Sequence, residues 1–292
     1  EKEMDRMLEL FKKLEFDKKL NENIEKLNDL AKEQQKLSEE SKDKKSNKEE
    51  LQKKQEDLKK QAEDIKQELK DLQQKNEEME NPTDYNAEEQ EMKDIQDKMD
   101  KSSEELQKNN KQKAADAQKD AAEKMKQLAN KMKQRQNDAE AEELDLNIRA
   151  LRQILENLIT LSFKQENTME KLKRTSTNDP QYVALTQVQK NIKDDMKLIE
   201  DSLFALSKKV VEIKSIINRE TGKVNEQIER AILLLADRRT GDATVRQQYA
   251  MTSMNNLALL LTEILDQMQQ EVERALKNRQ RDFVLFRATF KG

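Results

Sequence analysis

The longest hydrophobic pattern in the sequence runs from Asp179 to Asp237. Its apolar residues form two interleaved series with a seven-residue period, one made of Leu185, Ile192, Ile199, Leu206 and Ile213 and the other of Met196, Leu203, Val210, Ile217, Val224 and Ala231. Alternating steps of three and four residues place such a series on one face of a helix that packs against other helices. Asp179 suits an N-cap and Pro180 suits the first helical position. The pattern therefore predicts one very long helix over 179–237, roughly 85 Å in length.

The first half of the chain carries narrower apolar stripes. Residues spaced three or four apart predict an amphipathic helix from Met4 to Leu37. Between residues 41 and 48 the stripe stops. This fits either a hinge, with Asn47 as N-cap and Glu50 completing a capping box, or a polar stretch of one continuous helix. One seven-residue lattice crosses the stretch and keeps the continuous helix open, through Leu30, Leu37, Leu51, Leu58, Ile65, Leu72 and Met79.

A helix break is predicted over 81–86, because Pro82 removes a backbone donor and restricts the residue before it. Asn86, with Glu89 three residues later, predicts the start of a further helix that continues to about residue 135. The region 1–135 is thus expected to consist of charged coiled-coil helices with a hairpin break at 81–86. The methionines and alanines of the third helix indicate adaptable core packing rather than a metal site.

Residues 134–143 lose the apolar pattern and mark the expected boundary between two subdomains. Beyond it, two further apolar stripes flank the long helix, and the three together predict an up-down-up three-helix bundle over 144–270. The segment 271–292 combines basic and apolar residues, and its pattern favours a weakly ordered tail over a docked or paired segment. The expected fold class is all-α: elongated coiled-coil hairpins and a three-helix bundle built around one very long helix.

Composition supports an ordered helical chain. The 292 residues are 40% charged and 3% aromatic, with three glycines and two prolines, which is typical of long helices. High charge also marks disordered chains, but the net charge of only −4 and the heptad series favour ordered helices. No apolar run approaches the ~18 residues of a membrane span. Because the chain starts at Glu1 rather than at a methionine, we expect it to be a piece of a larger protein.

The residue types limit the chemistry that the segment can perform. Cysteine is absent, which excludes disulfides and thiolate metal sites, and histidine is absent, which removes the commonest general base and nitrogen ligand. No glycine-rich phosphate-binding motif occurs. Asp194 and Asp195 are adjacent, so on a helix they point about 100° apart and do not converge. We therefore expect no cofactor, no metal and no enzymatic activity in this segment.

Two clusters are candidate contact sites. In the turn before Arg246, Gly241 suits a C′ position with positive φ, Asp242 suits an N-cap, and arginines suit a helix C-terminus. The alternative is a partner-docking tip, made of Arg238, Arg239, Thr240, Gly241, Asp242 and Arg246. A basic cluster is a candidate contact for an anionic surface, made of Arg274, Lys277, Arg279 and Arg281. Elsewhere lysines alternate with acids at three- and four-residue spacing, so the sequence does not favour nucleic-acid binding.

Four stretches carry a resemblance to a known family: Met4–Phe11, Leu151–Leu158, Ala236–Ala243 and Met254–Leu261. They resemble large proteins from Bacteroidota that are classified as a domain of unknown function, in which N-terminal membrane helices precede a long helical region. The resemblance covers roughly residues 1–270. It implies a membrane-anchored parent at the cell envelope, of which this chain is an internal part, and it carries no known catalytic residues. The sequence after Val272 departs from the family, which continues with a segment rich in Gln, Met and Gly.

These observations predict a non-enzymatic structural or interaction protein, an elongated helical scaffold or tether at the cell envelope that contacts protein partners. The alternative is a regulatory adaptor of an ATPase or other enzyme, acting through the helical-hairpin tip. The apolar seam of residues 48–135 is weak and needs further helices to cover it. These helices could come from the same chain or from a second copy in a homo-oligomer.

Overall fold

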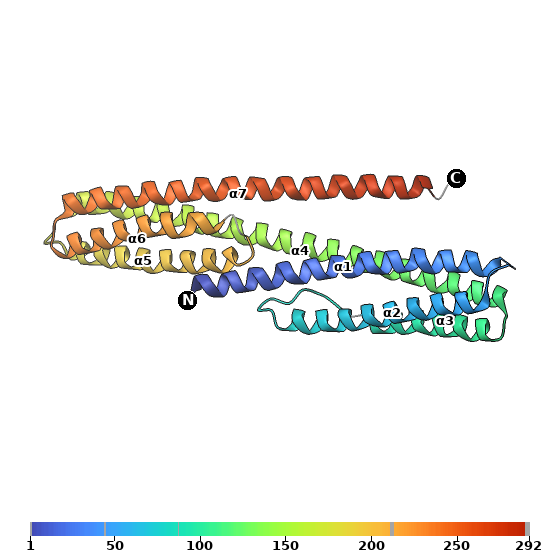
Figure 1. Ribbon diagram of the computed structural model, residues 1–292. Helices are drawn as coiled ribbons and strands as arrows, with labels where there is room; N and C mark the ends of the chain where they lie inside the picture. The colour runs from blue at the N-terminus through green and yellow to red at the C-terminus, as the bar shows by residue number, and fades with distance from the viewer. Residues whose placement is uncertain (1, 44, 87, 211–212, 290–292) are drawn as a thin grey trace. The chain divides into compact units, whose positions relative to one another are not determined.

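The computed structural model describes residues 2–43, 45–86, 88–210 and 213–289, and for residues 2, 3, 6, 214–218, 275, 276 and 278–289 it describes the backbone alone. Within these residues the chain forms seven α-helices and no strand (Figure 1). The helices are α1 (Lys2–Lys42), α2 (Lys48–Glu77), α3 (Glu89–Gln107), α4 (Lys111–Arg174), α5 (Pro180–Ser207), α6 (Lys214–Ala236) and α7 (Thr240–Thr289). The predicted all-α fold class is confirmed.

The chain divides into two compact units, unit 1 (Glu1–Glu140) and unit 2 (Ala141–Gly292). In unit 1, α1, α2, α3 and the first half of α4 share one hydrophobic core. In unit 2, the second half of α4 shares its cores with α5, α6 and α7. Each unit is therefore a bundle of four helical segments. The division falls inside the polar stretch 134–143, yet α4 continues through it, because Gln, Arg, Ala and Glu lose the apolar stripe without losing helix propensity.

The structure selects the hinge between α1 and α2. The helices are separated by residues 43–47, and Asn47 caps α2 by accepting a hydrogen bond from the Glu49 amide at 2.9 Å. The seven-residue lattice therefore does not come from one continuous helix across residues 41–48. Since α1 and α2 pack against each other, both need an apolar stripe, and the two stripes face one another across the hairpin.

The break predicted over 81–86 is confirmed, and a buried asparagine holds the loop. Asn76 accepts the Thr83 amide at 2.9 Å and donates to the Thr83 carbonyl at 2.8 Å. The Tyr85 ring packs edge-on against Phe16, with centroids 5.3 Å apart. A polar residue in the α2 seam is thus explained by a local loop contact.

The single helix predicted from Asn86 to residue 135 is wrong, because it is interrupted at Lys108–Asn110. Asn109 adopts a left-handed conformation with φ 59°, and the Asn110 amide reaches back to the Glu105 carbonyl at 2.8 Å. These are the bonds of a Schellman C-cap, which asparagine adopts more readily than most residues. The chain reverses there, so that α4 packs beside α3 instead of extending it.

The single very long helix predicted over 179–237 is also wrong. The Asp179 cap and Pro180 start α5 as predicted, with the Asp179 carboxylate accepting the Gln181 amide at 2.8 Å. The helix ends at Ser207, and α6 returns to pack against α5. Neither glycine nor proline marks the turn. Two helices that pack against each other as a hairpin need the same apolar stripe as one long straight helix. The heptad series therefore did not reveal the reversal.

This reversal changes the expected bundle. Residues 144–270 contain four helical segments in place of the predicted three, because the long helix is divided into α5 and α6. The segment 271–292, expected as a weakly ordered tail, is helical as far as Thr289 within the described residues.

Candidate functional site

The turn between α6 and α7, singled out from sequence, is organised around a buried tyrosine. Tyr182, near the start of α5, donates its hydroxyl hydrogen to the Leu235 carbonyl at 3.0 Å and receives a hydrogen bond from the Thr240 hydroxyl at 3.4 Å. Its side chain is almost fully buried with Leu172 and Ala243. One phenol thus joins the beginning of α5, the end of α6 and the beginning of α7.

Arg238 occupies the position that sequence analysis assigned to Gly241. Arg238 has φ 61°, and the next amide, that of Arg239, bonds to the Leu234 carbonyl at 2.8 Å, so Arg238 is the left-handed C′ residue of α6. Its guanidinium donates to the Thr177 carbonyl at 3.1 Å and to Asn178 Oδ1 at 2.9 Å. The arginine can hold a conformation usually left to glycine because these two acceptors anchor its side chain.

The predicted roles of Gly241 and Asp242 are therefore wrong: both lie inside the first turn of α7, and neither described glycine has positive φ. Asp242 is paired with Arg239 at 2.7 Å, and a carboxylate in the first turn stabilises α7 through the helix dipole. Arg246 donates to Gln227 Oε1 at 3.3 Å. The contacts of these side chains lie within unit 2 and give the turn a structural role; docking at this tip stays a prediction.

The basic cluster at the end of α7 is described only in part. Arg274 and Lys277 are exposed on α7. The side chains of Arg279 and Arg281 lie outside the described residues. Contact with an anionic surface stays a prediction.

Sequence reasoning missed a polar layer buried across unit 1. Gln34 and Gln55 donate to each other's carbonyl oxygens at 3.0 and 3.2 Å. Gln55 Oε1 also accepts the Ser102 hydroxyl at 2.9 Å and the Gln118 amide at 3.0 Å. All four side chains are fully buried, and each comes from a different helix. Gln55 is therefore the hub of a layer that joins all four helices.

Unit 2 contains a second layer of the same kind. Gln165 of α4 and Gln189 of α5 exchange hydrogen bonds at 2.8 and 2.7 Å, and Gln247 of α7 donates to Gln189 Oε1 at 2.6 Å. All three are fully buried. A glutamine on the apolar lattice, as at position 55, was the sequence signal for such a layer, but its partners become visible only when the helices are placed.

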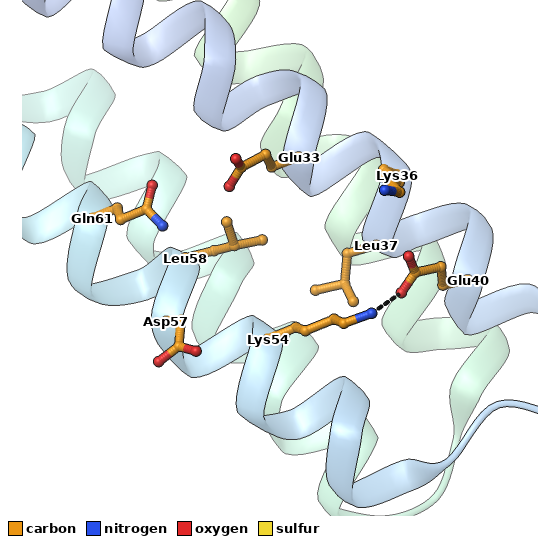
Figure 2. A pocket seen from close by; sticks show the side chains of 8 residues that line it. All are labelled: Glu33, Lys36, Leu37, Glu40, Lys54, Asp57, Leu58 and Gln61. Atoms are coloured by element: carbon orange, nitrogen blue, oxygen red, sulfur yellow. Dashed lines mark hydrogen bonds and ion pairs between the residues drawn. The ribbon is translucent and has the colours of Figure 1, made fainter.

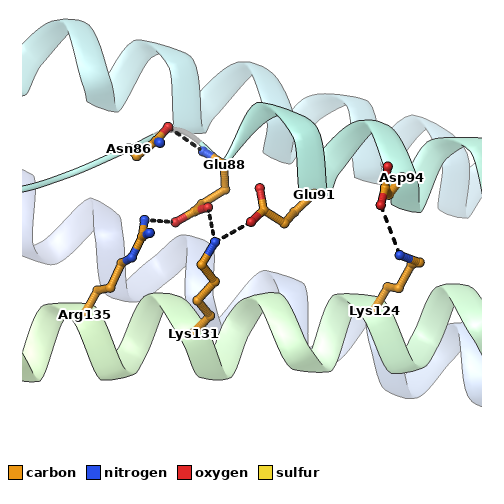
Figure 3. Close-up of polar contacts among 7 residues, drawn as sticks. All are labelled: Asn86, Glu88, Glu91, Asp94, Lys124, Lys131 and Arg135. Atoms are coloured by element: carbon orange, nitrogen blue, oxygen red, sulfur yellow. Dashed lines mark hydrogen bonds and ion pairs between the residues drawn. The ribbon is translucent and has the colours of Figure 1, made fainter.

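A network of ion pairs joins the start of α3 to α4 (Figure 3). Glu88 is buried with φ 50°, and its carboxylate pairs with Lys131 at 2.7 Å and with Arg135. Lys131 also bonds to Glu91, which lowers the pKa of that carboxyl, while Glu88 and Glu91 raise the pKa of Lys131. Every carboxylate drawn there has a cationic partner, so the network suits fixing α3 on α4 better than transferring protons.

A groove between α1 and α2 is lined by residues of mixed charge (Figure 2). Leu37 and Leu58 are buried beneath it, and Lys54 and Glu40 close one side with an ion pair of 2.8 Å. Lysines and carboxylates alternate around it without converging on a common point. The groove resembles the solvated seam between two packed helices more than a ligand pocket.

The first turns of α1 expose an apolar stripe. Its members are Met4, Met7, Leu8, Phe11 and Leu14, which are between 53% and 73% exposed. Their spacing of three and four residues puts them on one side of the helix, and a contiguous stripe of this kind is typical of surfaces that contact another chain.

Two properties of the described residues bear on the remaining chemistry. The chain has no histidine or cysteine, and no group of three or more acidic side chains among these residues is placed so that it could hold a metal ion. No helix in the same residues is both long and apolar enough to cross a bilayer.

The chain was compared with protein-family models, with curated proteins and with solved structures, and none of the three comparisons finds a match.

Proposed function

We propose that this chain is a non-enzymatic helical scaffold or tether, placed at the cell envelope by a membrane-anchored parent protein and acting through protein partners. The observation that carries the proposal is that the described residues of the two units serve helix packing: apolar and amide side chains fill the interiors, and charged side chains pair around them. Each interior is apolar and is crossed by a polar layer whose amides bond to one another, and in unit 2 the apolar residues form two clusters. Lysines and carboxylates beside these seams form ion pairs between neighbouring helices, such as Lys59 with Asp100, Lys124 with Asp94 and Lys164 with Asp195.

Element length supports the same role. The 41 residues of α1 extend for about 60 Å in a straight helix. A compact globule of 140 residues would have a radius of gyration of only about 14 Å. Unit 1 is therefore elongated by itself, as suits a part that spaces or connects others. The exposed stripe on α1 supports the interaction part of the proposal.

Small-angle X-ray scattering on the full chain tests the scaffold role at the level of shape. A compact protein of 292 residues would have a radius of gyration of about 19 Å, and we expect a value well above it. A value near 19 Å would contradict the proposal.

Replacement in cells tests the function itself. In the parent gene product, exchanging this segment for an unrelated antiparallel helical bundle of matched length should preserve part of the parent's role if the segment serves as a spacer. Deletion of the segment should abolish that role. Equal loss from replacement and from deletion would show that specific side chains, and not length, are required.

A further inference from the structure

The buried positions of unit 1 recur in unit 2 with the same order and spacing. The described buried residues of α1 are Phe16, Leu20, Asn23, Ile24, Leu27, Leu30, Ala31, Gln34, Leu37, Ser38 and Ser41. Exactly 131 residues later, in α4, stand Asn147, Leu151, Ile154, Leu155, Leu158, Leu161, Ser162, Gln165, Thr168, Met169 and Leu172, and each of these is buried as well. Gln34 of the first layer thus corresponds to Gln165 of the second.

The second helices correspond in the same way. The buried residues of α2 are Leu51, Gln55, Leu58, Ala62, Ile65, Leu69, Leu72 and Asn76. Residues 134 positions later are again all buried: Leu185, Gln189, Ile192, Met196, Ile199, Leu203, Leu206 and Val210. The hub Gln55 corresponds to the hub Gln189. The offset is larger by three because three more residues separate Leu172 from Leu185 in unit 2 than separate the equivalent Ser41 from Leu51 in unit 1. The helices themselves are separated by five residues in both units, 43–47 and 175–179.

The third and fourth helices correspond with an offset of 129, and here helix ends agree as well as buried positions. Gln107 and Ala236 end α3 and α6, while Lys111 and Thr240 begin α4 and α7. The left-handed residues Asn109 and Arg238 are 129 apart too, each in a Schellman turn. Identical residues lie at the same offset around these turns, as the pairs Leu106/Leu235, Ala114/Ala243, Gln118/Gln247, Ala121/Ala250, Met125/Met254 and Leu128/Leu257.

A hydrogen bond between two turns of the unit is also repeated. In unit 1, Lys111 Nζ bonds to the Ser46 carbonyl at 2.6 Å, and in unit 2, Arg238 bonds to the Thr177 carbonyl at 3.1 Å. Ser46 and Thr177 are equivalent by the offset of the first helices. In each unit a basic side chain at or next to the third turn therefore bonds to the equivalent backbone carbonyl of the first turn, although Lys111 corresponds to Thr240 and not to Arg238.

A shared heptad period does not account for this agreement. A seven-residue period reproduces buried positions within one helix, whatever its partners. It does not set the helix ends or the left-handed residue, and it does not place a glutamine at the same level in three of the four corresponding helices. The one difference within the layer is conservative in size, since Ser102 of unit 1 corresponds to the fully buried Ala231 of unit 2.

We propose that the chain is a tandem duplication of one four-helix unit, in which α4 is the last helix of the first copy and the first helix of the second. The two glutamine layers are then equivalent positions that set the helix register in each copy. This goes beyond the proposed scaffold role and does not depend on it. It adds a way in which such a protein changes length, because units joined through a shared helix can be added one at a time.

An in-register insertion tests the duplication. Because Gln34 and Gln165 are equivalent, residues 1–165 can be followed directly by residues 35–292, which adds one unit to the full chain and keeps every buried position on its lattice. We expect a monodisperse protein with the same helicity per residue by circular dichroism and a melting temperature within about 5 °C of the parent.

The matched control joins residues 1–165 to residues 37–292. This shift of two residues turns the following segment by about 200°, and it places Glu39, Glu40 and Asp43 where Leu37, Ser38 and Ser41 are required. We expect this control to lose helicity or to aggregate. Equal behaviour of the two insertions, whether both fold or both fail, would overturn the proposal.

A smaller exchange keeps the chain length. Replacing Lys108-Asn109-Asn110 by the equivalent Asp-Arg-Arg of positions 237–239 should leave helicity unchanged and lower the melting temperature by less than about 5 °C. A matched variant with Asp-Arg-Arg at 107–109 moves the Arg-Arg pair out of register and should lower it by more. If the two triplets behave alike, the turns are not equivalent and the duplication is wrong.

Discussion

Gln34 and Gln55 lie fully buried in the core of unit 1 and exchange two hydrogen bonds, amide to carbonyl in both directions. Two buried amides that satisfy each other avoid most of the desolvation cost that either would bear alone. The pair also admits only one axial alignment of α1 and α2, because a shift of one turn would leave both amides facing methyl groups. In this way, a polar pair within an apolar seam sets the register of the two helices.

The hub glutamine is therefore expected to be sensitive to substitution. Gln55→Leu removes the acceptor used by Gln34, Ser102 and Gln118, and leaves their donors buried without it. We expect a loss of about 1–3 kcal/mol in the free energy of unfolding, measured by urea denaturation. Gln61→Leu, at an exposed position of the same helix, is the control and should change stability by less than about 0.5 kcal/mol. Higher stability of Gln55→Leu would contradict the expected cost of leaving these donors buried without an acceptor.

Acid should weaken unit 1 through its carboxylates. The pKa of Glu91 is lowered by its hydrogen bond to Lys131, and that of Asp94 by its hydrogen bond to Lys124. A carboxyl whose pKa is lower in the folded than in the unfolded chain adds stability above the unfolded value, about 4.3 for Glu, and that stability is lost as pH falls through the folded value. We expect the melting temperature to decrease as the pH is lowered below about 4.

Lys131→Met tests which contact carries this pH dependence. Arg135 still pairs with buried Glu88 in this variant, so we expect a loss of about 1–2 kcal/mol at neutral pH. The decline of stability below about pH 4 should become shallower, since Glu91 then has a more ordinary pKa. Lys126→Met, at an exposed position of α4, is the control. An unchanged acid profile in Lys131→Met would assign the pH dependence to other groups.

Two substitutions of Arg238 separate its backbone from its side chain. Arg238→Ala keeps the left-handed conformation and removes the bonds to Thr177 and Asn178, so it should lower stability. Arg238→Gly removes the same bonds but relieves the left-handed strain, and should be more stable than Arg238→Ala by about 1–2 kcal/mol. Thermal melting of both variants measures the difference. Equal melting temperatures would argue against a left-handed residue at this position.

A glycine inside α6 is expected to cost stability. Gly222 is exposed, and a Cβ added there would meet no atom within 4 Å. Gly222→Ala should therefore raise the free energy of unfolding by about 0.5–1 kcal/mol, from helix propensity and lower unfolded-state entropy. Gly241→Ala is equally free of clashes but lies in the first turn of α7, where the gain should be smaller. A loss of stability on Gly222→Ala would contradict the helical geometry given for this residue.

The local signals in the sequence were sound where one residue type has one conformational effect. Pro82 lies in the break between α2 and α3, where a missing amide prevents a helix from continuing, and Asp179 with Pro180 starts α5, where a side-chain acceptor caps the first turn. The turn at Gly241 was misplaced by three residues. Arg238 takes the left-handed position instead, and its side chain bonds to acceptors at residues 177 and 178 that are distant in sequence.

The apolar lattice by itself determined that this protein is all-α and, outside the exposed first turns of α1, which face of each helix is buried. Helical geometry converts a spacing of three and four residues directly into a face. The lattice did not determine where the chain reverses. The turns after Gln107 and Ser207, and the pairing of Gln55 and Gln189 with their partners, were decided by tertiary packing. The reason is that an apolar stripe demands burial without naming its partner, so a straight helix and a folded hairpin satisfy the same sequence pattern.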